Sequence, residues 1–142
     1  MEKYITWDAQ TPGISFSERR GRIIVFKKTL EKLGFPAYFR FLFDPEHKSF
    51  VVECCEMDNE GAHKLSKSSK NEYCEIKSLS LVRLVARSCG WNEKISYRVP
   101  GVVVPEFNLV QFDLTKALEI HEGRLTEPDM LSFSDDYAFL ED

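Results

Sequence analysis

An alternation of apolar and polar residues over two neighbouring stretches constrains the fold of this chain more than any other feature. In residues 37–44 the side chains of Phe39, Phe41 and Phe43 fall on one face, and residues 49–55 repeat the alternation after a short turn that contains a proline. Successive side chains of a β-strand point to opposite faces, so a period of two indicates a strand with one buried face. The two stretches therefore predict an antiparallel hairpin whose phenylalanines enter a core.

The residues before this hairpin predict a second hairpin and a short helix. The segment 14–26 holds two β-rich stretches on either side of a basic turn, where Gly21 supplies the positive φ of a tight turn. In residues 27–33 the apolar side chains follow helical spacing, and Gly34 stands where a left-handed residue ends a helix. Residues 14–56 are thus predicted to form a strand, a turn, a strand, a helix and a hairpin.

The later segment 73–118 has the same order of elements. A strand is predicted at its start, followed by a helix over residues 81–89 with apolar side chains at helical spacing, and then by two more β-rich stretches. The order strand, helix, strand, strand occurs twice, which indicates two pseudo-repeats, residues 14–56 and 73–118. Each repeat alone has few apolar residues, so we expect both to share one α+β domain over residues 1–122, built as a small β-barrel.

Composition limits the classes of function. The chain has 142 residues, 43% of them hydrophobic, which suffices for one domain, and no apolar run reaches the roughly 20 residues of a membrane span. We therefore expect a cytoplasmic protein without a membrane contact. The stretch 57–71 is rich in Lys, Ser and Asn, with Leu65 as an isolated apolar residue, and is predicted to be a linker between the two repeats.

No residue pattern points to catalysis or to a bound cofactor. The cysteines, Cys54, Cys55, Cys74 and Cys89, lack the spacing of a zinc site or of a thiol-exchange motif, and the histidines are dispersed. The sequence also lacks a recognisable nucleophile with its base, a glycine loop for phosphates and a paired-carboxylate motif. We therefore expect a protein that is not an enzyme and that holds no metal and no cofactor.

Charge is distributed unevenly along the chain. The net charge is -4, but residues 123–142 hold six acids and one arginine and so carry -5, which leaves +1 for residues 1–122. Acids interleaved with aromatics indicate that residues 123–142 form a tail that docks on a surface, its own or a partner's, and competes with DNA for basic residues. Within residues 17–32 six basic residues stand against two acids, and such a cluster can neutralise phosphates. The candidate DNA-binding residues are Arg19, Arg20, Arg22, Lys27, Lys28 and Lys32.

The first repeat resembles the swapped-hairpin unit of the AbrB and MraZ family of bacterial transcription regulators. The likeness rests on Gly21 and Arg22, the apolar residues that follow them, a lysine-rich helical turn that ends at Leu33 and Gly34, and the hairpin beyond. It covers residues 14–56 closely and the second repeat only in element order. The resemblance implies two interlocked units in a small β-barrel, with DNA contacts made by the arginines around the first turn.

Two departures from the family pattern change what the resemblance implies. Phe26 stands where the family has the proline that starts its helix. Tyr73 and Cys74 stand near the position where the second repeat would carry another Gly-Arg pair. We therefore expect one arginine-bearing turn per barrel rather than two.

Two functions remain open from the residues alone. The first is a DNA-binding transcription regulator that uses the basic turn. The second is a non-enzymatic protein-interaction module or phage-type accessory factor, with Phe35, Tyr38 and Trp91 as candidate aromatic anchors. The basic turn also fits a solvated surface in which Arg22 pairs with Glu18 or with the acidic tail.

Overall fold

The computed structural model describes residues 9–65, 73–121 and 124–125. In chain order its elements are β1 (Gly13–Ser17), β2 (Arg22–Phe26), α1 (Lys27–Lys32), β3 (Tyr38–Asp44), β4 (Ser49–Cys54), β5 (His63–Lys64), β6 (Tyr73–Lys77), α2 (Leu79–Cys89), β7 (Ser96–Val104), η2 (Pro105–Phe107), β8 (Leu109–Asp113), η3 (Leu114–Lys116), β9 (Leu118–His121) and β10 (Arg124–Leu125). Neither α-helix of this described part is long and apolar enough to span a bilayer.

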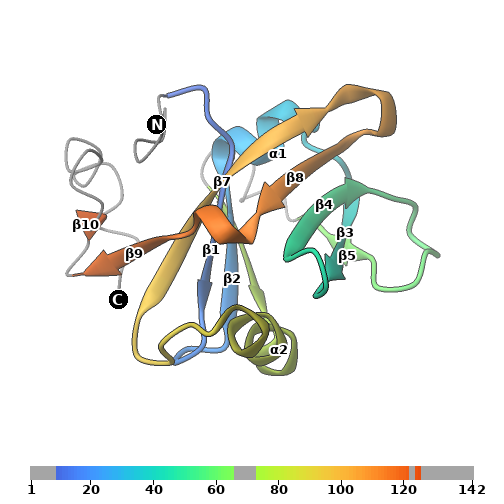
Figure 1. Cartoon of the computed structure of the whole chain (residues 1–142). Coiled ribbons are helices and arrows are strands. Elements are labelled where there is room, and N and C mark those ends of the chain that lie inside the picture. Colours follow the sequence, from blue (N-terminus) through green and yellow to red (C-terminus); the bar gives the residue numbers. More distant parts are fainter. Residues whose placement is uncertain (1–8, 66–72, 122–123, 126–142) are drawn as a thin grey trace.

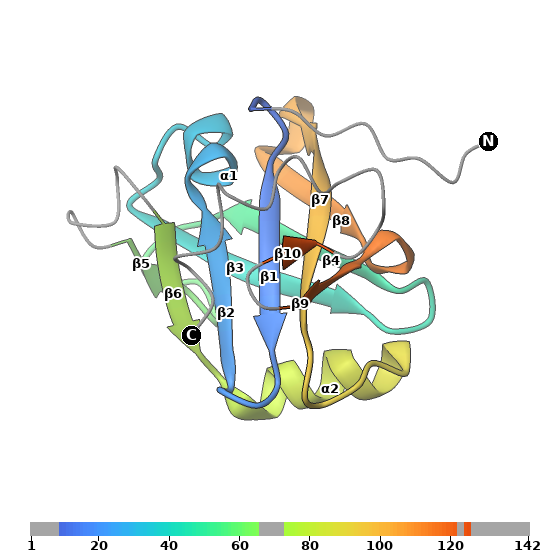
Figure 2. The same cartoon turned by 90° about the vertical axis from the view of Figure 1, so that its left-hand side faces the viewer.

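The strands form an antiparallel sheet that curls into a half-barrel (Figures 1 and 2). Their order is β5-β3-β4-β8-β7-β1-β2-β6, and β9 pairs with β7 and with β10. The nine-residue β7 connects two parts of the sheet, because its residues 97–100 pair with β1 while its residues 101–104 pair with β8. The α+β prediction is therefore confirmed in its coarse form, which is a small fold of mostly antiparallel strands with two α-helices.

The hairpin of β3 and β4 supplies the centre of the core. Phe39 of β3 pairs with Cys54 of β4 in the antiparallel register. Phe39 and Phe50 are fully buried, and the ring of Phe50 meets that of Phe16 on β1 edge to face, with 5.0 Å between the centroids. The hairpin predicted over residues 37–55 is therefore confirmed, because alternate side chains of both strands enter one core.

The two α-helices lie at opposite ends of β2 (Figure 2). Helix α1 follows β2 directly, whereas α2 follows β6, which runs antiparallel to β2 and so ends where β2 begins. Buried Thr29 fixes α1 to β1, because its hydroxyl accepts a hydrogen bond from the N–H of Gly13 at 2.8 Å and donates one to the carbonyl of Gly13 at 2.7 Å. Helix α2 ends at Gly90 with φ +67°, as its sequence predicts.

The stretch predicted as a linker, residues 57–71, is partly attached to the sheet. His63 pairs with Phe39 as part of β5. Leu65 is buried and donates its N–H to the carbonyl of the residue before β3 at 2.9 Å. The linker prediction is therefore wrong where β5 forms, because a single apolar side chain reaches the core and a short strand suffices to hold it.

The C-terminal part of the sheet extends past residue 122, the expected end of the domain. Strand β10 pairs with β9, with Leu125 opposite Ile120. The remainder of the predicted acidic tail, residues 126–142, lies outside the described residues.

Candidate nucleic-acid interface

The six candidate cations lie at the two ends of β2 rather than on one surface. Arg19 and Arg20 are exposed in the turn before this strand, whereas Lys27, Lys28 and Lys32 belong to α1 after it. A five-residue strand is roughly 16 Å long. Figure 2 accordingly places the turn beside α2 and places α1 at the opposite end of the sheet. The basic cluster of the sequence is thus divided by the fold.

Arg22 is engaged with the neighbouring strand. It begins β2, its side chain is 14% exposed, and its Nη1 lies 3.4 Å from Oε2 of Glu75 on β6. An ion pair between Arg22 and Glu18 was one possibility from the sequence. The Glu18 carboxylate instead faces α2. On α1, Lys28 Nζ donates to Glu31 Oε1 at 3.0 Å, and this hydrogen bond lowers the pKa of Glu31. Arg22 and Lys28 therefore each neutralise a carboxylate of the chain itself.

The basic turn is fixed against the start of α2. The N–H of Gly21 donates to the carbonyl of Glu18 at 3.1 Å, and the N–H of Ser78 donates to the carbonyl of Gly21 at 2.9 Å. Gly21 has φ +65°, and a Cβ there would lie 3.2 Å from the Cβ of Leu79. Glycine suits this left-handed conformation and avoids a tight contact between the turn and the helix. The turn is therefore a supported part of the surface and not a free hairpin tip.

Two arginines of α2 join the turn on the same surface. Arg83 and Arg87 are one helical turn apart, with side chains 54% and 69% exposed. Arg87 Nη2 lies 3.6 Å and Arg83 Nε lies 3.9 Å from Oε2 of Glu18, whose own side chain is 8% exposed. The sequence interpretation missed both arginines. Their i, i+4 spacing on the polar face of a predicted helix was visible, but only the tertiary contact brings that face to the turn.

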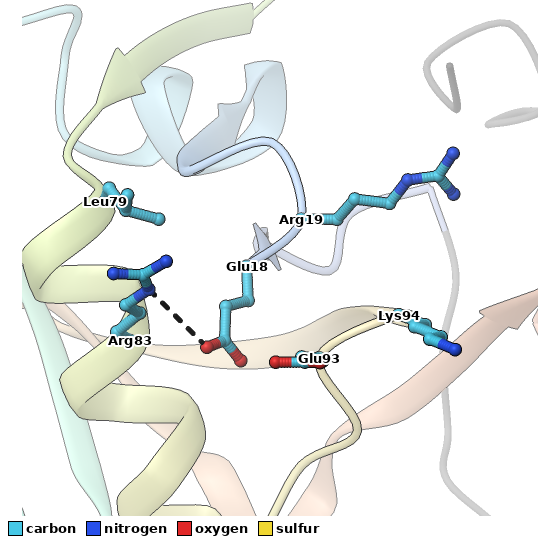
Figure 3. A pocket seen from close by; sticks show the side chains of 6 residues that line it. All are labelled: Glu18, Arg19, Leu79, Arg83, Glu93 and Lys94. Atoms are coloured by element: carbon cyan, nitrogen blue, oxygen red, sulfur yellow. Dashed lines mark ion pairs between the residues drawn. The ribbon is translucent and has the colours of Figure 1, made fainter.

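A pocket of about 470 Å³ opens between the turn, α2 and the loop that follows α2. Figure 3 shows Glu18 extending from the turn into this pocket, with its carboxylate directed toward Arg83 and Glu93. In the same view Arg19 and Lys94 point outward from the rim. The pocket thus has the carboxylates of Glu18 and Glu93 inside it and the cations Arg19 and Lys94 at its rim. Its lining residues are Glu18, Arg19, Leu79, Arg83, Glu93 and Lys94.

The loop that forms the third wall of the pocket is held by local contacts. The N–H of Asn92 donates to the hydroxyl of Tyr97 at 2.9 Å, and the N–H of Lys94 donates to the side-chain oxygen of Asn92 at 2.8 Å. Trp91 stacks on Tyr97, with 4.5 Å between ring centroids and 15° between planes. Trp91 was a candidate anchor for a partner, but it packs here within the chain. The loop is therefore held by contacts within the chain.

Metal-binding and thiol chemistry find little support in the described residues. No group of three or more His, Cys, Asp or Glu side chains lies close enough there to hold a metal ion. Burial raises the pKa of the Cys54, Cys55 and Cys89 thiols, which disfavours the reactive thiolate form. The arrangement that the fold does assemble is a charged surface around the turn and α2.

We name this surface the turn–α2 surface and define it by seven charged residues. Five cations and two carboxylates give it a formal charge of +3. Comparison of the chain with protein-family models, with curated proteins and with solved structures gives no significant match. The function is therefore inferred from the charge and the geometry of the turn–α2 surface. Its members are Glu18, Arg19, Arg20, Arg83, Arg87, Glu93 and Lys94.

Proposed function

We propose that this protein is a cytoplasmic, non-enzymatic DNA-binding protein of the transcription-regulator type, and that it binds DNA through the turn–α2 surface. One observation carries the proposal: the basic turn packs on α2, so that Arg19 of the turn lines the same pocket as Arg83 of the helix. Arginines neutralise phosphates and release the counterions condensed on DNA, which is the main source of sequence-independent affinity. Exposed guanidinium groups on a fixed turn and a helix suit this role, because little conformational entropy is lost when they bind.

The pairing of strands supports an architecture of two related units, as the resemblance to AbrB and MraZ proteins implies. If the first unit is β1 to β4 and the second is β5 to β8, equivalent strands are neighbours, because β2 pairs with β6 and β4 with β8. Likewise β1 pairs with β7, and β5 pairs with β3. We propose that an approximate two-fold axis relates the two units. An experimental structure in which the segment β2 to β4 fails to superpose on the segment β6 to β8 would contradict this architecture.

Two double variants test which end of β2 binds DNA. Arg19→Ala with Arg83→Ala removes two cations from the turn–α2 surface, and Lys27→Ala with Lys32→Ala removes two exposed cations from α1. Counterion release makes each phosphate contact worth roughly five- to eightfold in affinity at about 0.1 M salt. The first variant should therefore lose roughly 25- to 60-fold in affinity for a DNA oligonucleotide measured by fluorescence anisotropy, and the second should lose less than about threefold. Equal losses, or a larger loss in the α1 variant, would contradict the assignment of the surface.

A protein-interaction module is the second candidate function, and an exposed apolar row favours it. Leu42 on β3, Val51 on β4 and Val102 on β7 lie in register across the outer face of the sheet, with Gln111 of β8 between the last two. Leu42 is 41% and Val102 is 69% exposed, and Phe107 in the adjacent β7–β8 connection is 68% exposed. This function predicts no DNA affinity at low salt, together with self-association in sedimentation velocity that Val102→Glu abolishes.

A further inference from the structure

The carboxylate of Glu18 is largely buried and accepts no hydrogen bond from the described part of the chain. Its side chain is 8% exposed, and the cationic nitrogens that face it, on Arg87 and Arg83, stand 3.6 and 3.9 Å away. Hydrogen bonds between nitrogen and oxygen are about 2.7–3.2 Å long, so these two pairs are electrostatic contacts only. An ionised carboxylate accepts hydrogen bonds and donates none. Donors supplied by a ligand would complete the coordination of this group.

The position of Glu18 defines the kind of donor that can reach it. Its carboxylate lies inside the pocket rather than on a protruding tip, while Arg19 and Lys94 stand at the rim (Figure 3). A ligand that satisfies both regions carries an amino group at one end and an anionic group at the other. Cytosine and adenine nucleotides have this combination, and glutamate is a known acceptor for the exocyclic amino group of cytosine.

We propose that the pocket binds one unpaired nucleotide whose base carries an exocyclic amino group, as cytosine and adenine do. The amino group donates to Glu18, and the phosphate lies against Arg19 and Lys94 at the rim. This inference rests on the proposed DNA-binding function and names the ligand of the same surface. A base that enters the pocket to reach Glu18 must come from a single strand or leave the stack of a duplex.

The size and the walls of the pocket fit a nucleotide. A volume of about 470 Å³ lies within the usual range for small-molecule sites. Leu79 is 43% exposed and offers an apolar wall for the face of a base. The turn and the loop that form the other walls are fixed by the backbone contacts of Gly21 and Asn92. A site formed in advance loses less entropy when the ligand binds, which favours discrimination between bases.

Two labelled homopolymers distinguish this inference from simple phosphate binding. Decamers of deoxycytidine and of thymidine have the same phosphates, but only cytosine presents an amino donor. Fluorescence anisotropy at a slightly alkaline pH and about 0.1 M salt should give a dissociation constant roughly tenfold lower for oligo(dC) than for oligo(dT). In Glu18→Gln the carboxamide both donates and accepts, so the two constants should agree within about twofold. Glu106→Gln makes the same charge change at an exposed site outside the pocket and should keep the preference.

A measurement on the wild-type protein avoids any effect of the substitution on folding. Titration with cytidine monophosphate should shift the methyl resonances of Leu79 in NMR spectra and leave those of Val102 unchanged, and uridine monophosphate should shift them less. Equal affinity for both decamers, or unmoved Leu79 resonances, would overturn the nucleotide pocket and leave the proposed function standing. Binding of neither decamer, together with no binding of a duplex oligonucleotide at low salt, would overturn the proposed function itself.

Discussion

Gly101 marks the point at which β7 passes from its pairing with β1 to its pairing with β8, and adding one methyl group there tests the packing of the sheet. Gly101 lies opposite Phe112 of β8. A Cβ at this position would lie 2.5 Å from Cε1 of Phe112 and 2.7 Å from Cγ1 of Val110, and both of these neighbours are fully buried. Carbon atoms in contact normally stand about 3.5–4.0 Å apart. Gly101→Ala therefore forces a movement of about an ångström inside the core.

The expected cost follows from the measured range for overpacked cores. Extra methyl groups in a filled interior destabilise a protein by about 1–3 kcal/mol. For a chain of this length that corresponds to a fall in Tm of roughly 3–12 °C. Thermal unfolding followed by circular dichroism measures the Tm, and urea unfolding measures the free energy of unfolding with its m-value, which should not change.

A second substitution, at Phe112, distinguishes the steric overlap of the alanine Cβ with the Phe112 ring from other effects of Gly101→Ala. Phe112→Leu alone should destabilise the protein, because it removes buried ring atoms. In the Gly101→Ala background the same change also relieves the overlap, so the double variant should be more stable than the sum of the single effects predicts. An unchanged Tm in Gly101→Ala, or strict additivity in the double variant, would refute the packing described for β7 and β8.

Three further predictions concern charge. Arg22→Ala should lower the free energy of unfolding, measured by urea titration, by about 1 kcal/mol, because Arg22 pairs with Glu75 in a partly buried position. The control variant Arg19→Ala changes an exposed side chain, so its free energy of unfolding should stay within about 0.5 kcal/mol of the wild type. Burial lowers the pKa of His63 in the folded state, so the unfolded chain binds the proton more readily. The free energy of unfolding should therefore fall as the pH drops below about 6.5. In urea titrations at several pH values, His63→Gln should make this dependence of the free energy on pH weaker. Removal of residues 126–142, which hold six acids and no basic residue, should raise the affinity for DNA most at low salt, and unchanged anisotropy titrations would contradict that competition.

Local patterns of the sequence were sufficient for the elements that bury one regular face. The alternation of Phe39 with its neighbours predicted β3 and β4, and the left-handed glycines Gly21 and Gly90 were correctly placed at a turn and at a helix end. These features depend on side-chain period and on backbone conformation, both of which are visible in a short window of sequence. The attachment of β5 was not predicted, because it depends on the burial of a single residue, Leu65, far from other apolar residues in the chain.

The candidate site was harder to predict than the fold, because its parts come from three separate segments. The sequence grouped Arg19 with Lys32 by proximity along the chain, but β2 and its helix separate them in space. It also gave no means to bring Arg83 to Glu18, since that contact requires the antiparallel pairing of β2 with β6 to carry α2 back to the turn. Contacts between distant segments follow from the register of the sheet and not from the local composition.

The salt dependence of DNA binding tests the central proposal most directly. The observed affinity of the wild-type protein for a single-stranded oligonucleotide should fall with salt, with a slope of log K against log salt near -3 for four or five phosphate contacts at ~0.7 counterions each. In Arg19→Ala with Arg83→Ala the slope should become shallower by about 1.4, because two of these contacts are lost. Absence of binding of both single-stranded and duplex DNA at about 50 mM salt, or a slope that the two substitutions leave unchanged, would contradict DNA binding by the turn–α2 surface.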